Sequence, residues 1–239
     1  MRSGGLRAHA ACSNGRDVKK RKPAAKGEFV RDGADLPREL EEIPGEGLFS
    51  GPDIEISEQL VRGGRLPESG SLRSFQLEAC ALQTVAMPGL QIRTAQWKDV
   101  RFSDCDLANV HFRLLTAIRA EFLGCRMTGL RAGDSDFQDL LLSGGDQRYS
   151  QFRMSKFKNC EFDNCDFEDA DFYAADLSGC VFRRCNLRNV EMTRARLVGT
   201  DLRGSNIDGL RLTAEDVSGA VVDAAQALAL APLLGIRIL

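Results

Sequence analysis

The sequence places a large apolar side chain at every fifth position from Leu72 to Val222. This phase has 31 positions, of which 30 are apolar and one, Gln147, is polar. Ten of the chain's 13 phenylalanines fall in it. A second phase, two residues earlier, holds small side chains from Gly145 to Ser205, and the remaining positions are mostly Asp, Asn, Arg, Lys, Gly and Ser.

A period of five matches neither the 3.6-residue period of a helix nor the alternation of a strand. It predicts a backbone that turns a corner every five residues, with one large and one small side chain pointing inward on each side. The polar residues between them favour turns, and successive coils can hydrogen-bond with the spacing of strands. The alternative solenoid, a leucine-rich repeat of 20–29 residues, would not keep a large apolar residue at every fifth position.

These residues resemble the pentapeptide-repeat family, whose motif is A(D/N)LXX. Local matches are Ala170-Asp171-Phe172, Ala175-Asp176-Leu177 and Thr200-Asp201-Leu202-Arg203-Gly204. The resemblance covers about 150 of the 239 residues. It implies an all-β fold, a right-handed quadrilateral β-helix with 20 residues per coil. One face should then stack the large residues Leu72, Ile92, Phe112, Ala132, Phe152, Phe172, Met192 and Leu212.

The rest of the chain divides around this repeat. We expect residues 1–51 to be a largely disordered tail, 52–71 a cap or irregular first coil, 72–222 the β-helix, and 223–239 a C-terminal capping and dimerisation element. The tail carries a basic cluster from Val18 to Pro23. Such a cluster is more typical of a solvated tail than of a nucleic-acid contact, which is the alternative.

The C-terminal segment begins with a capping box, Asp223 to Gln226, that opens a short helix through Leu230. A final strand is expected from Ile236. This ending resembles the dimerisation element of pentapeptide proteins that modulate DNA gyrase, and so implies a homodimer. The residues expected to cover the last coil are Ala224, Ala227, Leu228 and Ala231. The candidate dimer interface is Leu230, Leu233, Leu234, Ile236, Ile238 and Leu239.

The cysteines follow the repeat. Seven of the eight occupy the small inward phase, where a small buried hydrophobe explains each better than a zinc ligand does. We therefore expect reduced thiols and no metal or cofactor, which favours a cytoplasmic location. No stretch approaches the roughly 18 apolar residues of a membrane span, and the first 26 residues lack the apolar run of a secretory signal. The seven are Cys80, Cys105, Cys125, Cys160, Cys165, Cys180 and Cys185.

No catalytic constellation is visible in the sequence. Its two histidines are His9, in the tail, and His111, at an outward repeat position where plain surface is the simpler interpretation. There is no glycine-rich phosphate loop and no HExxH motif. We therefore expect a non-enzymatic protein.

The best candidate for a partner surface is the middle of the repeat, where outward apolar residues gather. Gln147 allows two interpretations: a coil that bulges outward and presents Arg148 and Tyr149, or a packing fault with Gln147 turned outward. The candidate surface residues are Leu114, Ile118, Leu123, Leu141, Arg148, Tyr149 and Met154.

Function is predicted as a rigid protein-binding scaffold whose partner the sequence does not name. The alternative, implied by the resemblance, is a DNA mimic that modulates DNA gyrase or topoisomerase IV and gives quinolone protection. A mimic requires an uncompensated acidic surface. The acidic run from Glu161 to Asp176 should instead be neutralised by residues 20 positions away, with Asp163 facing Arg183, Glu168 between Arg148 and Arg188, and Asp176 facing Arg196.

Overall fold

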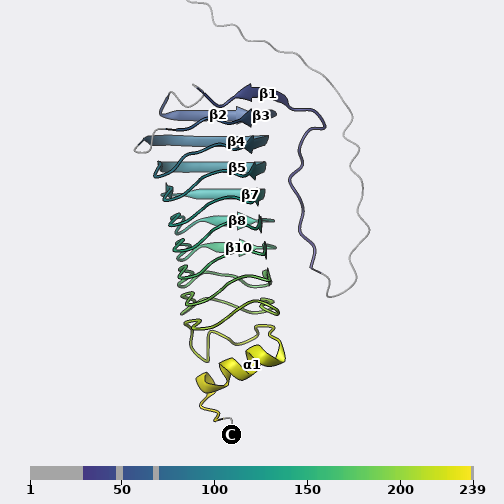
Figure 1. Cartoon of the computed structure of the whole chain (residues 1–239), viewed down its shortest axis with the longest axis vertical. Coiled ribbons are helices and arrows are strands. Elements are labelled where there is room, and N and C mark those ends of the chain that lie inside the picture. The colour runs from purple at the N-terminus through teal and green to yellow at the C-terminus, as the bar shows by residue number, and fades with distance from the viewer. Residues whose placement is uncertain (1–28, 47–50, 67–69, 238–239) are drawn as a thin grey trace, which may run out of the picture.

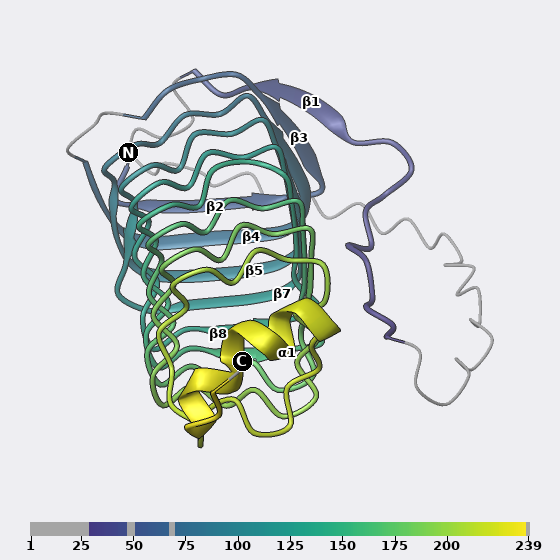
Figure 2. The ribbon, with the colours of Figure 1, turned by 60° about the horizontal axis from the view of Figure 1, so that its bottom comes forward.

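The computed structural model describes residues 29–46, 51–66 and 70–237, which form a rod of stacked coils (Figure 1). From residue 71 onward, each coil pairs in parallel with the next at a spacing of 20 residues, as for Trp97 with Leu77 and Phe182 with Phe162. The solenoid has about seven turns and a four-sided outline when seen toward its end (Figure 2). The predicted four-sided β-helix and its 20-residue register are confirmed.

The strands belong to one parallel sheet that winds around the rod, in the order β1-β3-β4-β5-β7-β9-β11-β12, with the other strands alongside. A short helix and a 3-10 turn follow at the C-terminal end. The bounds are β1 Glu41–Pro44, β2 Asp53–Ser57, β3 Gln59–Arg62, β4 Ser71–Gln83, β5 Gln91–Ser103, β6 His111–Phe112, β7 Leu115–Leu123, β8 Asp136–Gln138, β9 Leu141–Ser143, β10 Lys156–Lys158, β11 Glu161–Asp163, β12 Val181–Arg183, α1 Ala224–Leu230 and η1 Ala231–Leu234.

Each coil has four faces, named A to D in chain order. Their large inward residues in the coil of residues 151–170 are Phe152, Phe157, Phe162 and Phe167, all buried. The outward Asp or Asn before the large residue stabilises the turn that follows it. Asp171 Oδ1, for example, accepts a 2.8 Å hydrogen bond from the main-chain N–H of Tyr173. This local bond explains why Asp and Asn recur at that position.

The small inward positions also supply hydrogen-bond donors. Their hydroxyl or thiol groups donate to the main-chain carbonyl 23 residues earlier, on the preceding coil. Ser155 Oγ lies 2.7 Å from Ala132 O, and Thr200 Oγ1 lies 2.8 Å from Leu177 O. Ser, Thr and Cys therefore fit here because they are small and because several of them donate to a buried carbonyl group, although Ser150 Oγ has no such partner.

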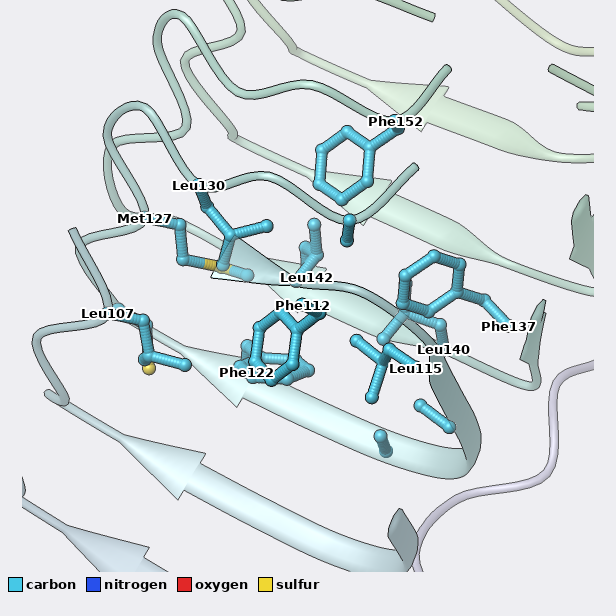
Figure 3. Packing of buried hydrophobic residues seen from close by; sticks show 14 of the residues in the cluster. Leu107, Phe112, Leu115, Phe122, Met127, Leu130, Phe137, Leu140, Leu142 and Phe152 are labelled. Carbon is cyan, nitrogen blue, oxygen red and sulfur yellow. The ribbon is translucent and has the colours of Figure 1, made fainter. Parts of the chain in front are cut away.

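The core is a continuous column of apolar side chains. The Phe162 and Phe182 rings stack with centroids 4.4 Å apart, and Phe102 stacks on Phe122 at 4.7 Å. Figure 3 shows the middle coils, where Leu130 lies beside Met127 and Leu115 beside Leu140. Only a gap of about 10 Å³ remains between these side chains.

Gln147 is buried, with 1% of its surface exposed, so the structure shows neither an outward bulge nor an everted side chain. Its Nε2 donates a 3.0 Å hydrogen bond to Gly144 O. The local adjustment lies in the backbone at Gly145, whose φ is 87° and where any Cβ would lie 2.1 Å from Cys125 O. The polar side chain of Gln147 thus stays inside because the carbonyl of Gly144 points toward it and accepts its hydrogen bond.

The N-terminal end differs from the expectation of a disordered tail to residue 51. Residues 29–40 form an extended arm along one side of the rod, and β1 then pairs with β3 (Figure 1). Residues 53–62 form regular strands, with β2 paired to β4 at a spacing of 21 residues. The basic cluster from Val18 to Pro23 lies outside the described residues.

The C-terminal helix begins and ends as the capping box predicts, with Asp223 accepting from the N–H groups of Ala225 and Gln226. Figure 2 shows α1 across the end of the rod. Of the predicted contact face only Ala231 is buried. The prediction is wrong for Ala224, Ala227 and Leu228, which are exposed, and Gln226 is buried instead. Residues 236–237 are not in a strand.

Candidate partner-binding face

The structure brings only part of the predicted surface together. Leu114 and Met154 lie at the same corner between faces A and B, two coils apart, and Tyr149 lies at the opposite edge of face A. These three side chains are 51–55% exposed. The remaining apolar candidates lie elsewhere: Ile118 at the corner between faces B and C, Leu123 at the corner between C and D, and Leu141 on face C.

Tyr149 and Met154 occupy backbone positions that disfavour large side chains. Their φ angles are 59° and 58°, in the left-handed region, where several other corners carry Gly or Asn. Holding a non-glycine residue there costs on the order of 1 kcal/mol or more. Tyr149 and Met154, the two large and exposed side chains at the edges of face A, therefore cost the fold some stability.

Between these edges, face A carries an aromatic side chain flanked by arginines. The guanidinium of Arg153 lies 4.7 Å from the ring centroid of Tyr173, and that of Arg194 lies 5.8 Å from it. Arg153 also pairs with Asp171 at 3.3 Å. The surface is hollowed here by about 300 Å³ between Arg153, Tyr173 and Arg211. Sequence reasoning missed Tyr173, although it lies 20 residues after Arg153 and therefore directly beside it.

Arg148 does not extend toward a partner. Its Nε and Nη2 donate to the two carboxylate oxygens of Asp146, at 2.9 and 2.7 Å, and it also pairs with Asp166 at 3.7 Å. The hydrogen bonds from Arg148 lower the pKa of Asp146 to about 2. Arg148 therefore belongs to an ion-pair network on face D.

Ion pairs also neutralise the acidic run. Asp176 pairs with Arg196 at 3.1 Å, and Glu168 pairs with Arg188 at 3.4 Å, as predicted. Two partners differ from the prediction. Asp163 pairs with Arg184 rather than Arg183, and Arg183 pairs with Glu161 at 2.9 Å. Because each partner lies on an adjacent coil, the ring of carboxylates does not present a continuous negative surface.

The N-terminal arm covers a second set of carboxylates at the corner of faces B and C. The N–H of Asp35 donates to Asp99 at 2.9 Å, and that of Ala34 donates to Glu121 at 3.3 Å. Asp99 and Glu121 are 6% and 7% exposed. Burial alone would raise their pKa values, but hydrogen bonds from Arg119 and Arg101, together with the arm's N–H groups, lower both.

The seven cysteines of the repeat are buried free thiols. Burial raises the pKa of the Cys80 thiol to about 12. The described residues include no group of three or more His, Cys, Asp or Glu side chains placed to hold a metal ion. His111 lies on the surface, with Nδ1 3.0 Å from Gln91 Oε1. No helix in the described ranges is long and apolar enough to cross a membrane.

The C-terminal end exposes several apolar side chains. Leu228 is 59% exposed, Ile236 52% and Leu233 39%, whereas Leu230 packs against the solenoid core. Of the other predicted interface residues, Ile238 and Leu239 lie outside the described residues, as does the side chain of Leu234.

Comparisons with known proteins agree with the repeat. The family model described as "Pentapeptide repeat region" matches residues 155–220. Trypsin-treated QnrB1, a plasmid-mediated fluoroquinolone resistance protein, aligns at 20% identity with a TM-score of 0.46, covering 83% of this chain and 95% of its own. No curated protein sequence gives a significant match.

Two cyanobacterial structures also align. The pentapeptide repeat protein Rfr23 from Cyanothece 51142 is 17% identical with a TM-score of 0.36, covering 41% of this chain and 64% of its own. HetL from Nostoc sp. strain PCC 7120 is 16% identical with a TM-score of 0.32, covering 72% and 89%. The family model matches residues 155–220, and the same five-residue period and 20-residue coil register run along the rest of the solenoid, which supports the pentapeptide-repeat family for this chain.

Proposed function

We propose that this protein is a non-enzymatic scaffold that binds a protein partner through face A of its middle coils. The observation that carries the proposal is the exposure of Tyr149 and Met154 at the two edges of face A, both in left-handed backbone conformations. Selection for stability alone would favour Gly or Asn there. Arg119 and Arg184 share this conformation, but each forms an ion pair within the chain. Tyr149 and Met154 are uncharged and about half exposed, and a binding role explains why they are kept.

The chemistry of face A supports this role. The chain has two tyrosines, and both Tyr149 and Tyr173 lie on this face, whereas the described phenylalanines from Phe75 to Phe182 are buried. Tyrosine, arginine and methionine are enriched in protein interfaces, and tyrosine and arginine dominate binding hot spots. Arg153 and Arg194 against the Tyr173 ring hold that side chain in place before binding, which reduces the entropy lost on association.

We further propose that two copies join through the C-terminal end. Leu228, Leu233 and Ile236 expose apolar surface beside the helix that closes the last coil. A two-fold axis there would bury this surface on both copies at once. The dimer would place the two A faces on one continuous scaffold.

A DNA mimic of gyrase or topoisomerase IV remains the competing proposal, with quinolone protection as its consequence. It requires a surface that imitates a row of phosphates. The pairs Asp176–Arg196, Glu168–Arg188 and Glu161–Arg183 work against such a surface. The scaffold is therefore the function that the geometry supports best.

Site-specific photo-crosslinking tests the scaffold. A photoreactive amino acid is placed at Tyr149 or Tyr173 in the full chain, which is expressed in its native cells, and adducts are identified by mass spectrometry. The matched control carries it at Leu123, on the corner between faces C and D. We expect one shared partner from the two face A positions and none from Leu123. Equal adducts from all three positions would refute a specific face.

A supercoiling assay separates the two proposals. Purified gyrase is assayed with and without the protein, in the presence and absence of a fluoroquinolone. The scaffold proposal predicts no change in supercoiling. Inhibition or drug protection that persists in a Tyr149→Gly/Tyr173→Ala variant would instead favour the mimic.

A further inference from the structure

Charged side chains in two columns of this rod alternate in sign along its axis. The column on face B reads Asp136, Lys156, Asp176, Arg196 and Asp216, and neighbours in it pair at 3.9 Å (Lys156–Asp136) and 3.1 Å (Arg196–Asp176). The corner between D and A alternates in the same way through Arg148, Glu168, Arg188 and Asp208. Alternation lets each charge interact with an opposite charge one coil away.

Like charges also stack in other columns, as Asp146 does beside Asp166, but one column places arginines beside one another on three successive coils. The corner between faces A and B carries arginine on three successive coils, followed by glycine, a fourth arginine and a tyrosine. Within the described chain, no carboxylate lies at ion-pair distance from Arg93 or Arg113, whereas Arg73 pairs with Asp53 and Arg153 with Asp171. Arg93 and Arg113 are both exposed. The arginine column consists of Arg73, Arg93, Arg113 and Arg153.

The stacking makes these charges repel. Coils are spaced by about 4.8 Å, so the Cα atoms of Arg93 and Arg113 are separated by roughly that distance. Arg131 lies on the neighbouring column, one coil further, and also lacks a carboxylate partner among the described residues. Like charges at this spacing destabilise a sheet unless an anion neutralises them. Beside Arg126, Arg183 and Arg196 the chain itself supplies that anion.

We infer that the arginine column is the docking site for an acidic protein segment. This inference rests on the proposed function, in which face A binds a protein partner, and it assigns the chemistry of that partner. From Arg93 to Arg153 the column spans three coil steps, about 14 Å, which matches four or five residues of extended chain. Carboxylates on the segment would supply the charges that the column lacks.

The surroundings favour a polypeptide over a nucleic acid. Leu114 and Met154 adjoin Arg113 and Arg153 in the chain and are about half exposed, so the site offers apolar contacts between its charges. The chain as a whole carries a net charge of −2. A nucleic-acid surface is normally strongly basic throughout. The ligand that fits is acidic and partly apolar.

Fluorescence anisotropy with a defined probe tests the inference. The probe is a labelled ten-residue peptide built from glutamate and leucine, compared with the same peptide carrying glutamine for glutamate and with a ten-nucleotide oligothymidine. We expect Arg93→Gln/Arg113→Gln to weaken binding of the acidic peptide at least tenfold. The matched variant Arg126→Gln/Arg196→Gln removes two arginines that already have partners, and should change it less than twofold. Equal effects of the two variants, or tighter arginine-dependent binding of the oligonucleotide, would overturn the assignment.

Thermal unfolding supplies a second measurement. Arg93→Gln/Arg113→Gln should leave the melting temperature unchanged or raise it, because it removes repulsion, whereas Arg126→Gln/Arg196→Gln should lower it. A drop equal to that of the control would show that these arginines already have partners. Crosslinking from Tyr149 distinguishes a failure of the acidic-segment inference from a failure of the proposed scaffold function. If the Arg93→Gln/Arg113→Gln variant captures a partner at Tyr149 as efficiently as the wild type does, that result supports the scaffold but contradicts the acidic-segment inference.

Discussion

The side-chain amide of Gln226 donates a 2.6 Å hydrogen bond to the main-chain carbonyl of Leu202. The same nitrogen donates to Ser205 O at 2.8 Å, and Oε1 accepts from the N–H of Asp223 at 3.0 Å. One coil earlier, Cys185 occupies the position that corresponds to Ser205, and its carbonyl accepts from the main-chain N–H of Asn206. The solenoid ends here, so no further coil of the described chain donates main-chain N–H groups to these carbonyls. The side chain of Gln226 donates to them instead, and it also caps helix α1.

Replacing Gln226 with leucine should destabilise the protein by about 1–3 kcal/mol. Leucine has a similar volume but leaves the carbonyl groups of Leu202 and Ser205 buried without these donors. Urea unfolding measures the change, and Ala225→Gln, on the exposed side of α1, serves as the control with an expected effect under about 0.5 kcal/mol. Equal midpoints for Gln226→Leu and the wild type would show that the cap contributes nothing.

Phe162→Ala should cost about 3–5 kcal/mol, because the ring is fully buried and its removal leaves a cavity in a core with little freedom to collapse. The ring packs on Phe182 at 4.4 Å and on Phe167 at 5.5 Å. Phe162→Leu, which refills part of the space, should lose less. Calorimetry or urea unfolding gives both values, and a loss below about 1 kcal/mol for the alanine variant would contradict the packing.

The sequence determines the coil and its core because a period of five admits one inward arrangement. It also places residues in columns, since positions 20 apart are neighbours. Leu114 and Met154 differ by 40 and share a corner, whereas Leu123 and Tyr149 belong to other corners. Arithmetic on residue numbers alone could therefore have separated the predicted surface into faces, and could have found the arginine column.

Two features lie beyond that arithmetic. The arm is fixed by main-chain N–H groups, such as those of Ala34 and Asp35, and every sequence offers such groups, so no pattern marks it. The inward Gln147 depends on a carbonyl that Gly144 turns toward it. Neither contact has a periodic signal, because each joins a side chain to backbone whose direction only the folded chain defines.

The native thiols should resist modification. The pKa of Cys80 is raised to about 12 by burial, so at pH 8 almost none of it is the reactive thiolate. A Cys12→Ser variant leaves the seven buried cysteines as the only thiols. We expect a thiol reagent to label none of them within an hour at pH 8 in native buffer, and all seven in denaturant. Rapid native labelling at Cys80 would contradict its burial.

Acid should release the N-terminal arm. The pKa values of Asp99 and Glu121 are lower in the folded protein than in the unfolded chain, where they are about 3.9 and 4.3. Groups with depressed pKa values stabilise the fold above the unfolded pKa, and that stabilisation is lost as the pH falls through the folded value. Arm contacts should therefore be constant from pH 7 to about 5 and disappear below about pH 4.

The NMR amide shifts of Ala34 and Asp35 follow this transition directly. Asp99→Asn and Glu121→Gln remove one carboxylate each and should weaken the arm contact already at pH 7, because the N–H groups of Asp35 and Ala34 then lose a charged acceptor. Asp208→Asn, away from the arm, is the control. A transition centred at pH 6, above the unfolded pKa values, would exclude these carboxylates as the latch.

The C-terminal dimer is tested by reversing the chemistry of its exposed side chains. Leu228 and Ile236 are 59% and 52% exposed, and neither contributes to the solenoid core. Glutamate at both positions should leave the coils intact but prevent two ends from meeting, because an interface would bury unpaired charges. Removing the whole element is a poorer test, since it also removes Gln226 and uncovers the last coil.

Light scattering at micromolar concentration reports the mass. We expect a dimer for the wild type, a monomer for Leu228→Glu/Ile236→Glu, and a dimer for Met154→Glu, which places a charge at an equally exposed apolar residue on face A. Circular dichroism of the three proteins checks that the β-helix is unchanged. A wild-type mass equal to one chain would reject the dimer, and so would a double variant that keeps the mass of two. Loss of the dimer in Met154→Glu would instead move the self-contact to face A, where it would compete with the proposed partner.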